Sequence, residues 1–355
     1  MRFGVVHVLI PAHNEADCIA VTLESLNAQT TPVASVLVVA DNCTDATAAI
    51  ATEHGADVIA TVDNPYMKAG ALNQGLEHLR PRIKWNDFVL IMDADSRLVE
   101  GWVAAALRTL RAHRNAGAVC ATFLGEPDQP GLIHALQRAE YARFARSISR
   151  RQARAQVLSG VATLLPNATL RAVDGARRSG RLASAPGIYQ VTAATEDIEL
   201  TLALRKLGYR PRAPKACRAF TDTMDSWSAL KIQRTRWQRG MLDAVSLYGS
   251  DRRTLPYALR LWGMYVVSLA PPLYVALLAA AVLLTGGVTY NPLWLMVLPL
   301  FSFERWWTVR SQGRQEQLLA VLLLPEWLYD NWRAGVYWLA LLQRIRRTER
   351  VWIPT

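Results

Sequence analysis

The sequence predicts an α/β fold with a mainly parallel sheet, followed by a small helical membrane region. Three observations predict it: short apolar runs alternate with helical patterns, polar residues follow several of these runs, and an uncharged apolar stretch begins near residue 256. Strands that are apolar throughout and separated by helices are typical of a parallel sheet covered on both faces. The length of 355 residues fits two structural units.

The expected strands and helices alternate along the first third of the chain. Apolar runs of strand length lie at residues 5–10, 36–40, 58–62 and 88–92. Apolar residues recur at helical spacing at 16–28, 45–54, 67–80 and 101–114. In such a sheet, ligands bind beyond the carboxyl ends of the strands. The residues that follow the strands are therefore the first candidates for a binding site.

Polar and acidic residues stand at three of these strand ends. The segments after the first, second and fourth runs are Pro11-Ala12-His13-Asn14-Glu15, Asp41-Asn42-Cys43-Thr44-Asp45 and Asp93-Ala94-Asp95. The side chains of Asp93 and Asp95, two apart in an extended segment, point the same way. This arrangement suits a hard divalent cation with oxygen ligands, Mg²⁺ or Mn²⁺. For Asn14 or Asp45 taken alone, a helix N-cap is the alternative.

The composition changes towards the C-terminus. Residues 261–285 form an uncharged run broken only by Pro271 and Pro272, and residues 292–303 continue the apolar character. We expect transmembrane helices at about 258–285 and 291–309. Flanking arginines place both flanks in the cytosol, so the protein is expected in the cytoplasmic membrane as a multi-pass protein. The expected domains are a cytosolic catalytic domain, 1–240, and a membrane region, 241–355.

Two charged segments allow more than one interpretation. Residues 317–342 are apolar but include Glu326, Asp330 and Arg333, whose charges a third span would bury at several kcal/mol each. We therefore expect amphipathic helices at about 316–346 at the cytoplasmic interface, with a re-entrant hairpin as the alternative. Arginines also recur at positions 138, 143, 146, 150 and 154. They form either a solvated helix face or a contact with lipid headgroups or an anionic acceptor.

The overall charge limits the classes of partner. A net charge of +11 with 51% hydrophobic residues excludes a disordered chain and is compatible with nucleic acid, nucleotide or membrane lipid. Nucleic acid is not expected, because the acidic strand ends would repel its phosphates. The four cysteines form no C-x-x-C pair, which favours reduced thiols in the cytosol. The first apolar run is too short for a signal peptide.

Four further clusters follow along the chain. They are Lys68-Ala69-Gly70-Ala71-Leu72-Asn73, Ser159-Gly160, Thr195-Glu196-Asp197 and Gln233-Arg234-Thr235-Arg236-Trp237. The first suits a phosphate or a base at a helix start, whereas Thr195 alone could be an N-cap and the arginines could flank a membrane. Taken in order with the strand ends, the clusters resemble family 2 glycosyltransferases. Specifically, they resemble the membrane-bound branch with cellulose, chitin and hyaluronan synthases, over roughly residues 5–240.

The resemblance implies a GT-A-type nucleotide-sugar-binding domain and a set of donor-site roles. Asp41 would contact the base and ribose of the donor, with Lys68 nearby. The floor of that pocket would be Pro11, Ala12, Asn14 and Glu15. Asp93 would face the ribose or sugar, and Asp95 would coordinate Mg²⁺ or Mn²⁺ bridging the diphosphate. Asp93 is the alternative metal ligand, direct or through water.

The resemblance also implies catalytic and acceptor-site roles. Asp197 would be the general base, with Glu196 as its neighbour at the acceptor site, and Arg236 would bind the leaving diphosphate. The acceptor site would further include Gly160, Gln233 and Trp237. Such a site would perform inverting transfer from an α-linked UDP-sugar, or alternatively a GDP-sugar, to form a β-linkage.

The acceptor and product are less constrained. A lipid-linked sugar, a glycan or a protein surface could accept the sugar. Two spans cannot enclose a saccharide conduit without self-association, so we expect a non-processive or short-product enzyme. The alternatives are a processive synthase working as a homo-oligomer and an inactive membrane-tethered scaffold that binds sugar or lipid.

Overall fold

The computed structural model describes residues 4–249, 251–287 and 293–346, and its core is a six-stranded sheet. The strand order is β3-β2-β1-β4-β8-β6. The first four strands along the chain pair in parallel: β1 (Val6–Ala12), β2 (Ser35–Ala40), β3 (Asp57–Ala60) and β4 (Phe88–Met92). β8 (Ala162–Pro166) runs antiparallel to both β4 and β6 (Val119–Cys120). The predicted α/β fold with a mainly parallel sheet is confirmed.

A second, three-stranded sheet lies beside the first. Its order is β5 (Ser96–Leu98), β9 (Arg218–Thr221) and β7 (Thr122–Gly125), with β9 antiparallel to β5 and parallel to β7. The sequence pattern did not predict β8 or this second sheet, because strands of two to five residues are too short for a clear periodicity.

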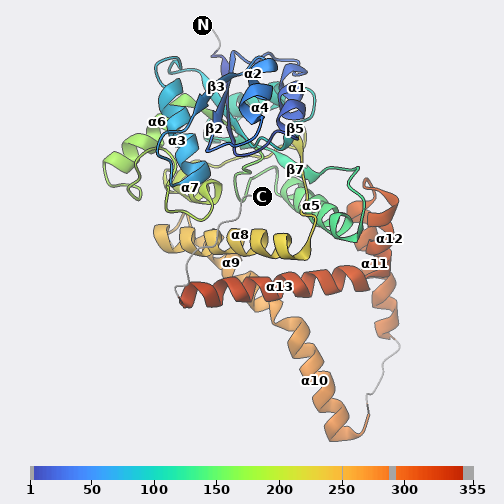
Figure 1. Ribbon diagram of the computed structural model, residues 1–355. Helices are drawn as coiled ribbons and strands as arrows, with labels where there is room; N and C mark the ends of the chain where they lie inside the picture. The colour runs from blue at the N-terminus through green and yellow to red at the C-terminus, as the bar shows by residue number, and fades with distance from the viewer. Residues whose placement is uncertain (1–3, 250, 288–292, 347–355) are drawn as a thin grey trace.

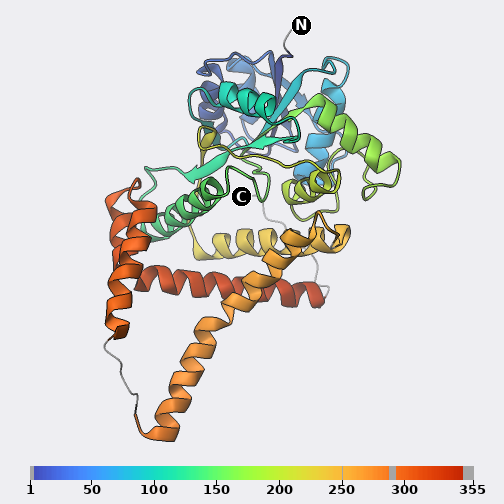
Figure 2. The same ribbon diagram turned by 180° about the vertical axis from the view of Figure 1, so that it is seen from behind.

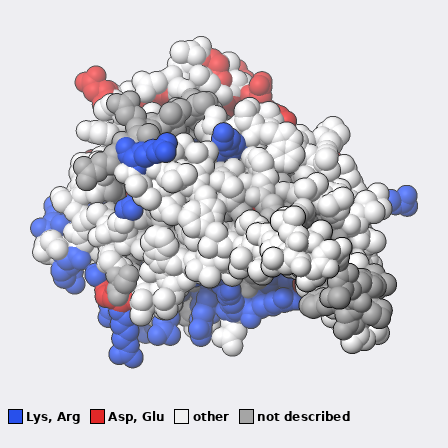
Figure 3. Space-filling view, turned by 90° about the horizontal axis from the view of Figure 1, so that it is seen from below, with Lys and Arg blue, Asp and Glu red and all other residues white. Residues whose placement is uncertain are grey.

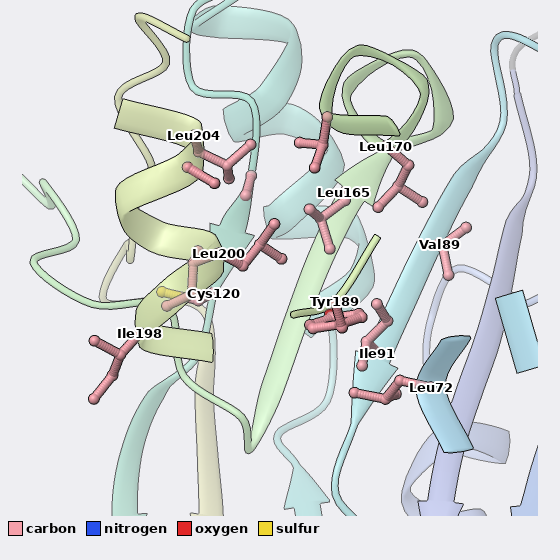
Figure 4. Close-up of a cluster of buried hydrophobic side chains, with 14 of the residues drawn as sticks. Leu72, Val89, Ile91, Cys120, Leu165, Leu170, Tyr189, Ile198, Leu200 and Leu204 are labelled. Carbon is pink, nitrogen blue, oxygen red and sulfur yellow. The ribbon is translucent and has the colours of Figure 1, made fainter. Parts of the chain in front are cut away.

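Helices cover both faces of the main sheet. One face carries α1 (Ile19–Asn27), α2 (Thr47–Glu53) and α4 (Trp102–Ala112), and the other carries α3 (Met67–Leu79), α6 (Asn167–Arg178) and α7 (Glu196–Lys206). Alternate residues of β1 divide between the faces, because successive side chains of a strand point in opposite directions. Leu9 packs on the α3 side, whereas Val8 and Ile10 pack on the α1 side. Figure 4 shows the α3 side, where Leu72 and Leu200 approach Ile91 of β4.

A buried ion pair fixes helices α6, α7 and α8 (Trp227–Tyr248) together. Arg177 Nη2 lies 2.7 Å from Glu199 Oε2, and both side chains are almost completely buried. The Tyr248 hydroxyl donates a further hydrogen bond to Glu199. α8 runs straight through residue 240, the expected domain boundary, so one helix carries the residues before and after it.

The described part of the chain contains one helix long and apolar enough to cross a membrane. Helices α9 (Leu255–Ser268) and α10 (Ala270–Thr285) together form this 31-residue candidate. α9 has buried residues such as Tyr257 and Leu261, whereas α10 has none. α11 (Leu293–Val309) returns towards the body of the molecule and diverges from α10 (Figures 1 and 2). The expected second span at 291–309 starts outside the described residues and stays a prediction.

The C-terminal helices pack against the part of the chain before residue 240, called the catalytic half below after its expected role. α12 (Arg314–Leu322) lies against α5 (Leu132–Arg150), and α13 (Leu324–Ile345) lies across α8 and α9 (Figure 1). Arg138 Nε of α5 is 2.6 Å from Glu316 Oε1, and Arg143 pairs with Glu326. Of the charges that argued against a third span, Glu326 and Arg333 thus pair with residues of α5, Arg143 and Glu140. Asp330 pairs instead with Arg305 of α11. Residues 347–355, which the expected membrane region includes, lie outside the described residues.

Gly240 lets α8 approach the start of α7 closely, and we expect Gly240→Ala to destabilise the protein. A Cβ at Gly240 would lie 1.8 Å from Thr195 Oγ1, so Thr195 or the helix must shift. The expected loss in unfolding free energy is about 1–3 kcal/mol, measured by denaturant titration. Gly175→Ala is the control, because nothing lies within 4 Å of its added Cβ. It should stabilise α6 by about 0.5–1 kcal/mol. Equal effects from both substitutions would contradict this packing argument.

Candidate active site

Four of the expected site residues meet in one pocket between α3, the loop before β8 and the start of α7. Lys68, Gly160, Glu196 and Asp197 line it, together with Tyr189 and the apolar residues Leu72, Ile91, Leu158 and Leu200. Three of the sequence clusters, which are spread between residues 68 and 197, therefore converge at one place. The remaining expected residues lie outside this lining, around it and on α8.

Lys68 bridges two carboxylates in the site. Its Nζ lies 2.5 Å from Asp93 Oδ1 and 3.0 Å from Glu196 Oε1. Burial opposes the charge on Lys68, but Asp93 and Glu196 hold its pKa well above the usual value. Burial alone would likewise raise the pKa of Glu196, but the Lys68 charge lowers it. Lys68 and Glu196 are thus both ionised near neutral pH.

Asp197 lies in the first turn of α7 with both carboxylate oxygens engaged. Its Oδ1 accepts a hydrogen bond from Ile198 N at 2.7 Å, and its Oδ2 accepts one from Gly160 N at 3.2 Å. Burial, followed by the negative charge of Glu196, raises the pKa of Asp197 to about 7, although Lys68 opposes the shift. A carboxylate with a pKa near the working pH suits general base catalysis.

Gly160 leaves room between charged groups. A Cβ at this position would lie 3.1 Å from Lys68 Nζ, 3.3 Å from Asp93 Oδ2 and 3.6 Å from Asp197 Oδ2. Any larger side chain would therefore fill the space that these three groups share. The glycine at position 160 is therefore explained by the limited space between these charged groups, and not by the backbone conformation.

Asp41 is held at the end of β2 by three donors. Thr61 Oγ1, Asn64 Nδ2 and Asn42 Nδ2 donate to its Oδ1 at 2.9, 2.8 and 3.1 Å. Thr61 and Asn64 were not expected from the sequence, although Asp63 and Asn64 directly follow the apolar run at 58–62, which was the available signal. Asp41 itself is buried.

The segment after β1 packs against the Asp41 segment. Pro11 and Ala12 are the last residues of β1 and pair with Val39 and Ala40. Asn14 Oδ1 accepts a hydrogen bond from Thr44 N at 2.8 Å. Asp45 Oδ1 accepts one at 3.0 Å from the N of Thr47, the first residue of α2, while Ala46 occupies the N-cap position.

Asp95 is a half-buried carboxylate near two other acids. Its Oδ1 accepts a hydrogen bond from Ser96 Oγ at 3.0 Å. Burial, followed by the charges of Asp93 and Glu15, raises the pKa of Asp95 to about 7. Burial also raises the pKa of Glu15. In the described part of the chain, no three His, Cys, Asp or Glu side chains could hold a metal ion by themselves. The residues present fit a cation that takes one or two carboxylates and completes its shell from a substrate.

The Gln233–Trp237 cluster lies on α8. Arg234 donates to Gln233 Oε1, and its guanidinium lies 4.2 Å from the centroid of the Trp237 ring. The charge of Arg236 is the smallest of the causes that lower the pKa of Glu196, after that of Lys68. Gln233 is buried, and the described hydrogen bond of its side-chain oxygen is with Arg234.

Glu140 of α5 was not expected from the sequence, yet it holds this cluster. It accepts from Arg234 Nη2 at 3.0 Å, from Arg333 Nη1 at 2.6 Å and from the Tyr329 hydroxyl at 2.6 Å. Burial alone would raise its pKa, but Arg234 and Arg333 lower it to about 2. The sequence did contain a signal for this role, because Glu140 is the one acidic residue of α5, a helix that has several arginines.

The comparisons with known proteins agree with this arrangement. Residues 7–165 match the model for glycosyl transferase family 2, and residues 88–324 match that for glycosyl transferase family group 2. The chain belongs to glycosyl transferase family group 2. Its fold is similar to that of the mannosyltransferase PcManGT from Pyrobaculum calidifontis, solved with GDP-Man and Mn²⁺. The TM-score is 0.65 at 18% identity, covering 98% of this chain and 89% of that one.

This family member also has curated relatives that are longer. It is 24% identical over 241 residues to the poly-beta-1,6-N-acetyl-D-glucosamine synthase of Staphylococcus aureus strain MSSA476. The corresponding Staphylococcus epidermidis protein is 23% identical. Both alignments cover 65% of this chain and 53% of the relative, so the chain spans about half the length of these proteins.

The resemblance predicted from the motifs is thus confirmed for family 2 glycosyltransferases and for the GT-A-like fold. The cellulose, chitin and hyaluronan synthase branch stays a prediction. The individual residue roles in this family member also stay predictions.

Because Glu140 neutralises the buried Arg234 and the half-buried Arg333, we expect Glu140→Gln to destabilise this glycosyltransferase family member strongly. Arg234 would lose its carboxylate partner and Arg333 would keep only Asp330, at a cost of about 3–5 kcal/mol in unfolding free energy. Glu77→Gln is the control, because Glu77 pairs with Arg80 on the surface at 3.1 Å and should contribute less than about 1 kcal/mol. Denaturant unfolding in detergent measures both. Similar losses for the two variants would contradict a special role for Glu140.

Proposed function

We propose that the protein is an inverting, metal-dependent glycosyltransferase. It would move a sugar from a nucleoside-diphosphate sugar to an acceptor hydroxyl at the membrane and form a β-linkage. The observation that carries the proposal is the pocket in which Lys68 bridges Asp93 and Glu196 beside Asp197. Membership of a family of glycosyltransferases supports the reaction class.

Asp197 is proposed as the general base. A hydroxyl is a poor nucleophile near pH 7 and needs a carboxylate within hydrogen-bond reach to take its proton in the transition state. The acceptor oxygen forms the new bond to the anomeric carbon while the bond to the diphosphate oxygen breaks. The proton passes to Asp197, and the bonding electron pair leaves with the nucleoside diphosphate. Attack opposite the leaving group inverts the anomeric centre.

The leaving diphosphate develops negative charge that cationic groups must stabilise. Arg236 is proposed to bind it, since arginine presents a planar fork to phosphate oxygens. Asp95 would hold Mg²⁺ or Mn²⁺, with Asp93 as the alternative ligand. When bound, the cation supplies charge neutralisation of the diphosphate. The crowding of Asp95 by Asp93 and Glu15 supports a cation there, because it would relieve their repulsion.

Asp41 and the segment after β1 are proposed to bind the nucleoside. The donors from Thr61, Asn64 and Asn42 all reach Oδ1, so they orient the carboxylate for a base or ribose hydrogen bond. Pro11, Ala12, Asn14 and Glu15 would form the floor. We propose a UDP-sugar first, and a GDP-sugar as the alternative that the PcManGT complex with GDP-Man supports.

The acceptor is proposed to lie between the pocket and α8. Gly160, Glu196, Gln233 and Trp237 would line its site, and a lipid-linked sugar, a glycan or a protein would fit there. The exposed α9–α10 helix supports a position at the cytoplasmic membrane with the catalytic half in the cytosol. We propose a single transfer or a short product. A processive synthase is the alternative, and the polymer named for the staphylococcal relatives favours it.

We expect Asp197→Asn to remove transfer and leave donor binding intact. Loss of a general base lowers turnover by about 10²–10⁴-fold. Purified protein in detergent is tested with UDP-glucose, UDP-N-acetylglucosamine and GDP-mannose, with Mg²⁺ or Mn²⁺, and nucleoside diphosphate release is measured. EDTA should abolish release, and product mass separates one transfer from many. Asp57→Asn is the control, since Asp57 pairs with Arg82 on the surface.

Two outcomes would overturn parts of this proposal. Undiminished turnover by Asp197→Asn removes the base assignment. If the native protein releases no nucleotide from any donor of the panel, with acceptor lipid extract present, the proposed activity is wrong.

The raised pKa of Asp197 predicts the pH dependence of transfer. The carboxyl stays protonated below its pKa of about 7, so kcat/KM should fall as the pH decreases through that value. Saturating Mn²⁺ keeps Asp95 ionised during the measurement. Glu196→Gln removes a neighbouring negative charge, so it should move this acid limb to lower pH whatever it does to the maximal rate. An acid limb at the same pH in both proteins would contradict the assignment.

A further inference from the structure

The arginines of α5 fall into two groups with different partners. Arg138 and Arg143 each pair with a carboxylate of the C-terminal helices, Glu316 and Glu326. Arg146, on the next turn, instead donates from Nη1 to the main-chain oxygen of Trp307 at 3.0 Å. No carboxylate of the described residues lies within 4 Å of the Arg146 guanidinium. One helix thus presents both neutralised and uncompensated charges.

A second arginine converges on the same oxygen. Arg310 Nη1 donates to the Trp307 main-chain oxygen at 2.8 Å, and its guanidinium carbon lies 3.7 Å from the Trp307 ring centroid. The Arg146 guanidinium carbon is 5.9 Å from the same ring. Two guanidinium groups therefore lie side by side around one tryptophan, and each has five N–H donors, more than one carbonyl can use.

The neighbouring charges leave the region around Arg146, Arg310 and Trp307, called the corner below, with an excess of positive charge. Desolvation comes first and the charges of Arg150 and Arg310 next among the causes that lower the pKa of Arg146. The negative charge of Glu304, on the same helix as Trp307, opposes this lowering of the Arg146 pKa, and the Glu304 side chain is exposed. The corner therefore holds an excess of positive charge that the described protein residues do not balance.

The corner lies next to the exposed apolar part of α11, on the side of the catalytic half. Leu300, Phe301 and Phe303 of α11 are all more than half exposed, so this part of the helix is apolar towards its surroundings. Ser302 Oγ donates to Val321 O at 3.0 Å, which places Ser302 level with the end of α12 and the start of α13. Trp307 lies about 7–8 Å further along α11, towards the catalytic half.

Seen from the side of α10 and α11, the molecule has a broad, largely uncharged face, with Lys and Arg side chains along part of its margin and Asp and Glu side chains along another part (Figure 3). A tryptophan flanked by arginines just above an exposed apolar helix is the arrangement found where membrane helices meet the headgroup layer.

We propose that Arg146, Arg310 and Arg150, with Trp307, form a binding site for the phosphate of an anionic phospholipid headgroup. The site takes no part in the transfer reaction and goes beyond the proposed function. Guanidinium forks bind phosphate oxygens with two parallel hydrogen bonds, which a point charge cannot provide. The headgroup phosphate supplies the negative charge that Glu316 and Glu326 supply to Arg138 and Arg143.

The test measures lipid binding to the full chain in a non-ionic detergent. Native mass spectrometry follows the fraction of protein that carries dioctanoyl phosphatidylglycerol or dioctanoyl phosphatidylcholine across a concentration series. Native protein should prefer phosphatidylglycerol. Arg146→Ala/Arg310→Ala should bind it about 30-fold more weakly, from the usual contribution of two arginines near an anionic surface.

The matched control removes two arginines elsewhere. Arg108→Ala/Arg114→Ala lowers the net charge equally, and both residues are exposed on or after α4, away from α11 (Figure 1). It should bind phosphatidylglycerol as the native protein does. If the double variant at 146 and 310 unfolds at a lower temperature, Arg310→Ala alone replaces it. Arg310 is exposed, so this single variant should keep the fold and bind about fivefold more weakly.

The proposal is overturned if native protein binds the two lipids equally, or if the double variant matches the control. Inorganic phosphate at millimolar concentration is the last arm. If it displaces phosphatidylglycerol from the native protein, the site belongs to a soluble phosphate and the lipid assignment is wrong. Retention of the lipid under phosphate supports it.

Discussion

The half-buried carboxylate of Glu140 is the interaction on which the relation between the two halves depends. It lies between Arg234 of α8 and Arg333 of α13 and accepts a third hydrogen bond from Tyr329. Without it, Arg333 would keep only Asp330, and the buried Arg234 would lose its carboxylate partner. An unpaired buried charge is far more costly than the pair is stabilising. α8 and α13 are therefore held in one relative position. The stack of Arg234 on Trp237 carries that constraint to the proposed acceptor site.

The charges in and around the pocket give its carboxyl groups different pKa values. Lys68 is shared by Asp93 and Glu196, and it holds the pKa of Glu196 low. Asp197 and Asp95 lack such a direct partner, and burial together with neighbouring acids raises the pKa of each to about 7. Environments that push the pKa values of neighbouring carboxyl groups apart are typical of acid–base sites. One lysine thus makes chemically equivalent side chains unequal.

The features that could be predicted from the sequence are those set by local pattern. The four parallel strands and their helices follow from periodicity, and the position of Asp41, Asp93 and Asp95 follows from the rule for strand ends. The β8 strand, the small second sheet and the role of Glu140 could not be predicted. They depend on contacts between distant segments, such as Glu140 with Arg234 and Tyr329, 94 and 189 residues apart. Gln233 was expected at the acceptor site, but its buried side-chain oxygen accepts from Arg234.

The continuity of α8 across residue 240 limits how the chain can be divided into fragments that fold. A fragment ending at residue 240 would cut the helix and remove Tyr248, which contacts the buried Glu199. It would also remove Tyr329 and Arg333, the partners of Glu140. The C-terminal helices are thus not a detachable anchor on an independent enzyme. They pack against α5 and α8 of the catalytic half. A chimera that takes the C-terminal helices from a relative would therefore also need that relative's α5 and α8.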